Sequence, residues 1–275
     1  MKPFYGWVIV GVGIVVTCVG MGAMTSLAVF LQPMSQAMGW SRTGIATAAL
    51  LVRNPPAASL GPAAVTTADG GSSMTIGQAL RTPQFLAIAF THFACCAAHS
   101  GPIFHMVTNA IDHGVTAMAA ATVFSVAGAA SFSGKIACGI LADRIGVKRT
   151  LVSGLALQAA AISLYLVTRD LSGFYAVALV FGFAYGGVMP LYAVVVREFF
   201  GARIMGAVFG AVSTVATLGM ALGPVAGGWL YDGFGSYAWL FIGSFGIGVG
   251  AVAIALTFRP PRALAPALPT PSMAH

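Results

Sequence analysis

The most informative stretch of the sequence is SFSGKIACGILADRIGVKRT, residues 131–150. Its apolar run ends at the pair Asp143-Arg144, a glycine follows two positions later, and the basic pair Lys148-Arg149 precedes the next apolar run. Hydrocarbon excludes charged side chains, and a positively charged loop between membrane helices stays on the cytoplasmic side. The pattern therefore predicts a tight cytoplasmic hairpin between two membrane helices.

The composition of the whole chain also indicates a membrane protein. Of its 275 residues 58% are hydrophobic and 7% are charged, and the mean hydropathy is +0.91. A soluble domain of this composition could not keep its surface polar. The net charge of +7 belongs to loops, where it sets the orientation of membrane helices. We expect an all-α, polytopic membrane protein that contacts membrane lipid and binds no nucleic acid.

Uncharged or nearly uncharged runs of spanning length follow one another after residue 83. They predict six helices, over residues 84–111, 114–142, 150–168, 171–196, 204–231 and 233–258. Nine basic residues flank one set of helix ends and only Arg169 flanks the other, which places both ends of the bundle in the cytoplasm. We therefore expect a six-helix transmembrane bundle over residues 81–262 and a disordered cytoplasmic tail over residues 263–275.

The region before the bundle is less regular. Residues 6–31 form an uncharged run of 26 residues, enough for a membrane helix that starts in the cytoplasm. In the next segment only residues 43–52 are uncharged, about 15 Å of helix or half the hydrocarbon thickness. Whether this segment crosses the membrane stays open. We expect residues 1–52 to hold the first helix and this short apolar segment, and residues 53–80 to form a flexible cytoplasmic linker.

The hairpin resembles the loop signature of the major facilitator superfamily of secondary transporters, G-x-L-a-D-r-x-G-r-k-r. The matching residues are Gly139, Leu141, Ala142, Asp143, Arg144, Gly146, Lys148 and Arg149, with Val147 as the one departure. In that family the signature occurs once in each six-helix half, and we find it once here. The resemblance implies that the six helices are one half of such a carrier, built as a pair of inverted three-helix repeats.

Two further stretches resemble the monocarboxylate transporters and the oxalate:formate antiporters. They are YGGVMPLYAVVVREFFG at residues 185–201 and GMALGPVAGGWLYD at residues 219–232. The second resembles the gating helix of that group, in which glycines permit close packing and a proline introduces a kink. A generic Gly-rich helix is the plain alternative. The residues expected to act in gating and packing are Gly139, Asp143, Arg144, Gly146, Arg149, Gly223, Pro224 and Gly227.

The N-terminal part resembles separate pieces of the same family. Residues 4–7 look like the start of the first transporter helix, residues 39–42 like the start of the second, and residues 50–56 like the end of the sixth. The resemblance implies a truncated form that lacks most of helices two to six. We expect such a chain not to transport as a monomer, whereas a homodimer could rebuild a pseudo-symmetric carrier.

Lys135 is the main candidate for substrate binding. It is the only charged side chain well inside a predicted span, about 12 Å along the helix from Asp143, and such residues usually face a cavity. The resemblance implies that this position carries the cation, usually Arg, that binds a substrate carboxylate. Lysine can hold an anion but lacks the bidentate fork, and Ser131 replaces the acidic neighbour of monocarboxylate carriers, which puts proton coupling in doubt. The plain alternative is a lysine that reaches the cytoplasmic headgroups.

The stretch HFACCAAH places His92, Cys95, Cys96 and His99 on one helical face. Imidazole and thiolate bind zinc or copper, so a non-transporting membrane protein that binds metal or haem is the alternative from another class. One face of one helix cannot close a tetrahedral site, however. We expect a cavity-facing stripe in which His92 or His99 binds an anion or relays a proton, and buried packing histidines are the plain alternative. Tyr185 is similarly placed to offer a hydroxyl.

The sequence contains no recognisable catalytic set, because its six acidic residues lie nearly all at helix ends and no phosphate loop or Ser-His-Asp pattern occurs. We expect that the protein is not an enzyme and that it binds no cofactor. His105 and Asn109, beyond Gly101-Pro102, are weaker candidates for an outer vestibule. The sequence as a whole predicts a secondary-active transporter of the plasma or inner membrane, with both termini cytoplasmic, that moves small organic anions such as mono- or dicarboxylates by alternating access. Substrate identity, coupling ion and the choice between symport and antiport stay open.

Overall fold

The computed structural model describes residues 35–44, 47 and 74–259, which are helical apart from short connections and contain no strand. Two helical pieces cover residues 35–38 and 42–44. The longer elements are α3 (Ile76–Leu80), α4 (Pro83–Asp112), α5 (Ala117–Ile145), α6 (Val147–Leu164), α7 (Leu171–Phe200), α8 (Ala202–Phe234) and α9 (Ala238–Leu256). The predicted all-α class is confirmed.

Each of the six predicted runs forms one long helix, from α4 to α9. Among the described residues, five of these helices are long and apolar enough to cross a membrane: α4, α5, α7, α8 and α9. The sixth, α6, has 18 residues and begins Val-Lys-Arg-Thr, which lowers its mean hydropathy. The chain is a multi-pass membrane protein, and its shortest bundle helix is less apolar than predicted.

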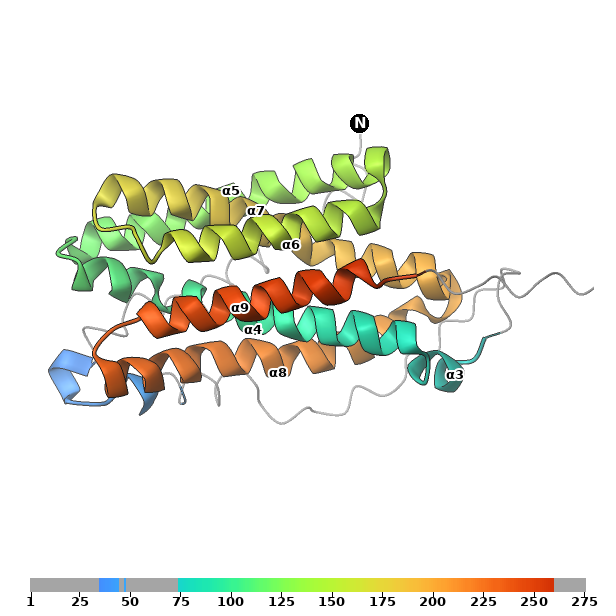
Figure 1. Cartoon of the computed structure of the whole chain (residues 1–275), viewed down its shortest axis with the longest axis horizontal. Coiled ribbons are helices and arrows are strands. Elements are labelled where there is room, and N and C mark those ends of the chain that lie inside the picture. The colour runs from blue at the N-terminus through green and yellow to red at the C-terminus, as the bar shows by residue number, and fades with distance from the viewer. Residues whose placement is uncertain (1–34, 45–46, 48–73, 260–275) are drawn as a thin grey trace, which may run out of the picture.

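The helices form two groups of three (Figure 1), with α5, α6 and α7 on one side and α4, α8 and α9 on the other. Helix α4 packs most extensively against α8 and α9, and α7 packs most extensively against α5 and α6. If α4, α5 and α6 are exchanged in order with α7, α8 and α9, the contacts of α4 with α8 and α9 become those of α7 with α5 and α6. Because successive helices run in opposite directions, α4 and α7 are antiparallel, so the pattern agrees with the predicted pair of inverted three-helix repeats.

Small residues let the backbones touch in the two most extensive pairs. Between α5 and α7, a Cβ atom added to Gly134 would lie 2.0 Å from the carbonyl oxygen of Phe183. Between α4 and α8, a Cβ added to Gly223 would lie 2.3 Å from the backbone nitrogen of Gly101. Larger side chains at these glycines would push the helices apart, as expected for helix contacts in lipid.

The two ends of the bundle are connected differently. Gly146 alone joins α5 to α6 and Gly201 alone joins α7 to α8, with φ angles of 90° and 80°. The predicted tight hairpin is therefore present. At the opposite end the connections are longer, over residues 113–116, 165–170 and 235–237. We name the end that holds Gly146 and Gly201 the signature end, and the opposite one the far end.

Helix α3 lies in the range expected to be a flexible linker. Thr75 caps it, and Thr75 and Gln78 form a reciprocal capping box. An Arg203 guanidinium nitrogen also donates to the carbonyl oxygen of Met74, at 3.0 Å. The end of the predicted linker, residues 76–80, is thus helical. The predicted first membrane helix, most of the short apolar segment, the rest of the linker and the tail lie outside the described residues.

Candidate substrate-binding site

Lys135 lies on the face of α5 that points away from the bundle. Its neighbours Phe132 and Ile136 are 68% and 53% exposed, whereas Ser131, Gly134 and Cys138 on the opposite face are buried against α7. Within the described part of the chain Lys135 makes no hydrogen bond or ion pair. The ammonium group is therefore available to a ligand or to a partner on that side of the bundle.

The exposed surfaces of the outer helices combine small and large residues. On α5 the space beside Gly128 and Gly139 is open. On α8 the exposed residues include Gly206, Gly210, Thr214 and Thr217. All three helices also expose large apolar residues, among them Phe132 on α5, Trp229 on α8 and Trp239 on α9. Small residues are enriched where membrane helices pack together, and the open spaces beside the glycines of α5 and α8 leave room for a neighbouring helix. A Cβ atom added to Gly139, which is expected to allow close helix approach, would meet no atom of another described helix within 4 Å.

The two histidines of the predicted polar stripe lie between α4 and α7. His92 is buried and stacks on Tyr192, with ring centroids 3.9 Å apart. His99 is fully buried, and its ring lies 4.8 Å from that of Tyr185. The structure thus brings the rings of His99 and Tyr185 together. No hydrogen bond or ring contact among the described residues joins either histidine to Lys135.

One cysteine of the same stripe contacts a glutamine and a histidine. Cys95 is buried and its sulfur lies 3.8 Å from the Gln158 side-chain oxygen on α6 and 3.8 Å from His99 Nδ1. In the ranges that the structure describes, no three His, Cys, Asp or Glu side chains converge on a point that could hold a metal ion. The packing of both histidine rings against tyrosines accounts for this stripe without a metal, so the metal or haem alternative gains no support.

The predicted hairpin residues are mostly solvent-facing. Asp143, Arg144 and Arg149 are exposed, and in residues 74–259 Asp143 makes no ion pair within 4.0 Å. The expected local neutralisation of its charge is thus not made by a direct salt bridge. Lys148 does have fixed partners: its ammonium nitrogen donates to the carbonyl oxygens of Leu256 and Phe258, at 2.8 and 2.7 Å. It thereby caps the last turn of α9.

The predicted gating residues of α8 lie in the contact with α4. Gly223 and Gly227 are buried there, beside Gly101 and His105. Pro224 lies inside the helix, where it cannot donate a backbone hydrogen bond. Its carbonyl oxygen is 2.9 Å from His105 Nε2. His105, expected near an outer vestibule, is instead fully buried, and Asn109 is 4% exposed.

One cluster was not anticipated from the sequence. At the far end, Arg42 forms a salt bridge with Asp112 at 3.1 Å, and Asp232 accepts from the backbone nitrogens of Arg42 and Thr43. Burial of the guanidinium would lower its pKa, but its hydrogen bonds to Asp112 and Tyr237 outweigh this and raise the pKa. The sequence shows Asp112 and Asp232 near the ends of two predicted helices and Arg42 in an N-terminal segment. Nothing in the sequence pairs them.

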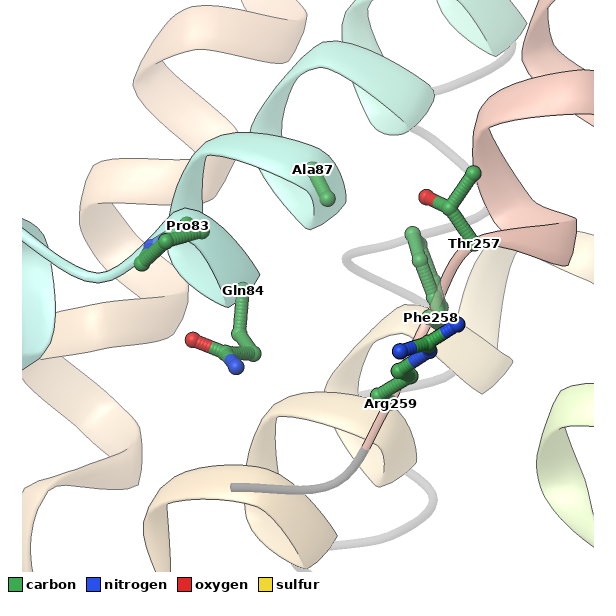
Figure 2. A pocket seen from close by; sticks show the side chains of 6 residues that line it. All are labelled: Pro83, Gln84, Ala87, Thr257, Phe258 and Arg259. Atoms are coloured by element: carbon green, nitrogen blue, oxygen red, sulfur yellow. The ribbon is translucent and has the colours of Figure 1, made fainter. Parts of the chain in front are cut away.

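A cavity of about 200 Å³ opens at the signature end, between the start of α4 and the residues after α9. Figure 2 shows its lining, which is Pro83, Gln84, Ala87, Thr257, Phe258 and Arg259. None of these residues was singled out from the sequence. The cavity therefore does not coincide with the predicted substrate site.

The fold and these residues define the class of the protein. It is a helical membrane protein whose bundle has the neighbour pattern of paired inverted repeats, with the signature hairpin at one end. Residues 85–274 match the model of the Major Facilitator Superfamily, and the chain belongs to that family.

Individual relatives narrow the similarity to one group. Monocarboxylate transporter 13 of Bos taurus is 29% identical over 191 residues, which is 68% of this chain and 45% of that protein. Monocarboxylate transporter 12-B of Danio rerio is 25% identical over 173 residues, 61% of this chain and 36% of that protein. The uncharacterized MFS-type transporter YhjX of Escherichia coli is 26% identical over 155 residues, 55% of this chain and 37% of that protein. The chain spans less than half the length of these relatives.

Proposed function

We propose that the chain acts in secondary-active transport of small organic anions, mono- or dicarboxylates, by alternating access. The observation that carries the proposal is the position of Lys135. It is a cation well inside the candidate span α5, on the exposed face of that helix. An ammonium group deep in the hydrocarbon region is costly where it faces lipid, whereas one that faces a cavity can bind a carboxylate. The similarity to proteins named monocarboxylate transporters supports the same substrate class.

The histidine stripe is proposed as a second part of the same pathway. His99 on α4 and Tyr185 on α7 lie together. Helix α4 also packs against α8, and α7 also packs against α5. A neutral imidazole and a phenol can each donate one hydrogen bond to an anion. Lys135 supplies the charge in this proposal, and His92, His99 and Tyr185 supply neutral hydrogen-bonding groups.

We propose a homodimer as the working unit of this chain. The open spaces beside the exposed glycines of α5 and α8 support it, because each half of a carrier supplies part of the binding surface. A second copy packed there would cover Gly128 and Gly210, and it would place two Lys135 side chains along one pathway. The mass of the purified protein in detergent, measured by light scattering, tests this directly: a monomer would contradict it.

The proposed orientation places the signature end and both termini in the cytoplasm. Seven Lys and Arg residues of the described chain lie at that end, namely Arg81, Arg144, Lys148, Arg149, Arg197, Arg203 and Arg259. Only Arg42 and Arg169 of the described residues lie at the far end. This asymmetry follows the positive-inside rule. The membrane itself is proposed to be the plasma or inner membrane.

Uptake of labelled lactate and oxalate into proteoliposomes tests the transport proposal. We expect Lys135→Ala to lower uptake at least about tenfold, because one charged hydrogen bond to a carboxylate is worth about 1.5–3 kcal/mol, and Lys135→Arg to retain most of it. Arg169→Gln is the matched control, since it removes one cation that bonds only to the Thr168 carbonyl oxygen. No uptake by the wild-type chain, or equal uptake by wild type and Lys135→Ala, would refute the proposal.

A further inference from the structure

Arg42 ties the N-terminal segment to the far end of the bundle. Its two terminal nitrogens donate to the two Asp112 carboxylate oxygens, at 3.1 and 3.2 Å, which is the paired geometry that arginine forms with carboxylates. One of these nitrogens also donates to the Tyr237 hydroxyl at 2.7 Å. Asp232 accepts from the backbone nitrogens of Arg42 and Thr43, at 3.3 and 3.1 Å, and from the Thr43 hydroxyl. One arginine thus joins a segment near residue 42 to the ends of α4, α8 and α9.

This contact is packed as well as charged. The Arg42 guanidinium carbon lies 3.6 Å from the centroid of the Tyr231 ring, a cation–π arrangement. A Cβ atom on Gly228 would lie 2.7 Å from the backbone nitrogen of Thr43, so the segment runs directly against α8. The Arg42 and Asp112 side chains are 11% and 21% exposed. Removing one partner from such a shielded pair costs far more than breaking a pair in water.

A directed chain of hydrogen bonds leads from Arg42 to the kinked helix. The Pro224 carbonyl oxygen can only accept, so His105 Nε2 donates to it, at 2.9 Å. The Nδ1 atom of the neutral imidazole is then an acceptor for the Tyr237 hydroxyl, at 3.2 Å. The Tyr237 oxygen in turn accepts from Arg42. The chain ends at the proline of α8, next to the close α4–α8 contact.

We infer that residues 41–44 form a latch that closes the far end of the bundle, and that release of Arg42 loosens α8 around Pro224. Two features support it: Arg42 and Thr43 bond to side chains at the ends of α4 and α8 and at the start of α9, and Tyr237 and His105 connect Arg42 to the Pro224 carbonyl oxygen of α8. Coupling of this kind requires a physical chain of contacts between an element that moves and a helix that bends. The inference goes beyond the proposed transport and does not depend on its substrate.

The test uses the full chain in proteoliposomes, with Cys18, Cys95, Cys96 and Cys138 replaced by alanine. Spin labels at Met38→Cys and Trp239→Cys report the distance between the N-terminal segment and α9, since both positions are exposed. In a separate protein, an impermeant maleimide reports the exposure of Thr108→Cys, whose native side chain is fully buried beside His105. Neither readout involves transport, so failure of the latch and failure of the carrier proposal are distinguishable.

We expect Arg42→Gln to lengthen or broaden the Met38–Trp239 distance and to speed maleimide labelling about tenfold or more, because Asp112 is left without its partner. Arg169→Gln, the control at the same end, should change neither. The exchange Arg42→Asp with Asp112→Arg should bring both readouts back towards the starting protein.

A Tyr237→Phe substitution tests the connection to α8. It keeps the Arg42–Asp112 pair but removes the hydroxyl that joins Arg42 to His105, so labelling at position 108 should rise while the spin-label distance stays unchanged. If Arg42→Gln is not folded by gel filtration, Arg42→Lys replaces it, since it keeps the charge and loses the paired bond. Unchanged distance and labelling in a folded Arg42 variant would overturn the latch. A changed distance with unchanged labelling would overturn its link to α8.

Discussion

The two ends of the bundle hold their helices together by different means. At the signature end, single glycines join α5 to α6 and α7 to α8, and neighbouring bonds are made to backbone carbonyls, as by Lys148. At the far end the connections are longer, and side chains distant in sequence meet, as Arg42 and Asp112 do. The signature end therefore adds one-residue turns to its side-chain bonds, whereas the far end depends on side-chain contacts that can be broken and remade without changing the chain path.

This difference predicts where the bundle is rigid. A one-residue connection leaves two helices little freedom to move relative to each other, while an ion pair and a hydrogen-bond chain offer discrete alternatives. Conformational change between two states needs such a bistable element. We therefore expect opening to begin at the far end, with the signature end as the hinge.

The largest effect is expected at Gly146. Its φ and ψ angles are 90° and 148°, a region that is almost restricted to glycine and costs another residue about 1–3 kcal/mol. Gly146→Ala should lower the unfolding free energy by that amount. Thermal melting in detergent measures this, with Gly139→Ala as the control because Gly139 is helical and has open space around it. Equal melting temperatures for the two variants would mean that the turn is not strained.

The signature end was predictable from the sequence because its determinants are adjacent in the chain. The hairpin follows from a charge pair, a glycine and a basic pair within residues 143–149, and the helix bounds follow from runs without charge. Hydrophobicity and length suffice for such elements, since hydrocarbon admits only helices and barrels. Helix α6 is less apolar than predicted because its first turn contains Lys148 and Arg149, which the predicted run over residues 150–168 left out.

The far end was not predictable, because its partners are 70 and 190 residues apart in sequence. A single sequence places Asp112 and Asp232 at helix ends but gives no rule for which loop arginine meets them. The same limit applies to the histidine stripe. Periodicity placed His92 and His99 on one face, but which aromatic rings would cover them, Tyr192 and Tyr185, depended on the packing of α7.

An effect of similar size concerns pH at the far end. Burial raises the pKa of Tyr237 to about 12, although the nearby Arg42 charge lowers it in part. An unfolded tyrosine loses its proton near pH 10, so the unfolded state binds fewer protons between pH 10 and 12 and is favoured as pH rises. The stabilisation from neutral Tyr237 is complete below pH 10 and is lost as pH rises through about 12.

Two pKa units correspond to about 2–3 kcal/mol. Melting curves at pH 9 to 12 should therefore fall more steeply for the wild type than for Tyr237→Phe, which has no proton to lose at this position. Parallel curves for the two proteins would show that Tyr237 is exposed to solvent at the far end.

A smaller effect is expected at Lys148. Its two bonds to carbonyl oxygens at the end of α9 are partly exposed, so their net contribution is about 1 kcal/mol. Lys148→Met keeps the aliphatic stem and should lower the unfolding free energy by that amount. Arg149→Met is the matched control, since Arg149 is an exposed neighbour with no bond in the described structure. If the control lost as much stability, the effect would come from charge at the signature end and not from the cap.

The smallest effect is expected at Gly235, where the far end differs most plainly from the signature end. Gly235 has φ and ψ of 66° and 15°, the left-handed conformation that ends α8, and open space around it. Alanine there costs about 1 kcal/mol, whereas asparagine adopts this conformation with little penalty. We expect Gly235→Ala to melt slightly below the wild type and Gly235→Asn to melt close to it, while the corresponding Gly146→Asn remains strongly destabilised because its ψ is extended. If asparagine were tolerated equally at both positions, the two turns would have the same backbone freedom, and the assignment of the signature end as the hinge would lose its basis.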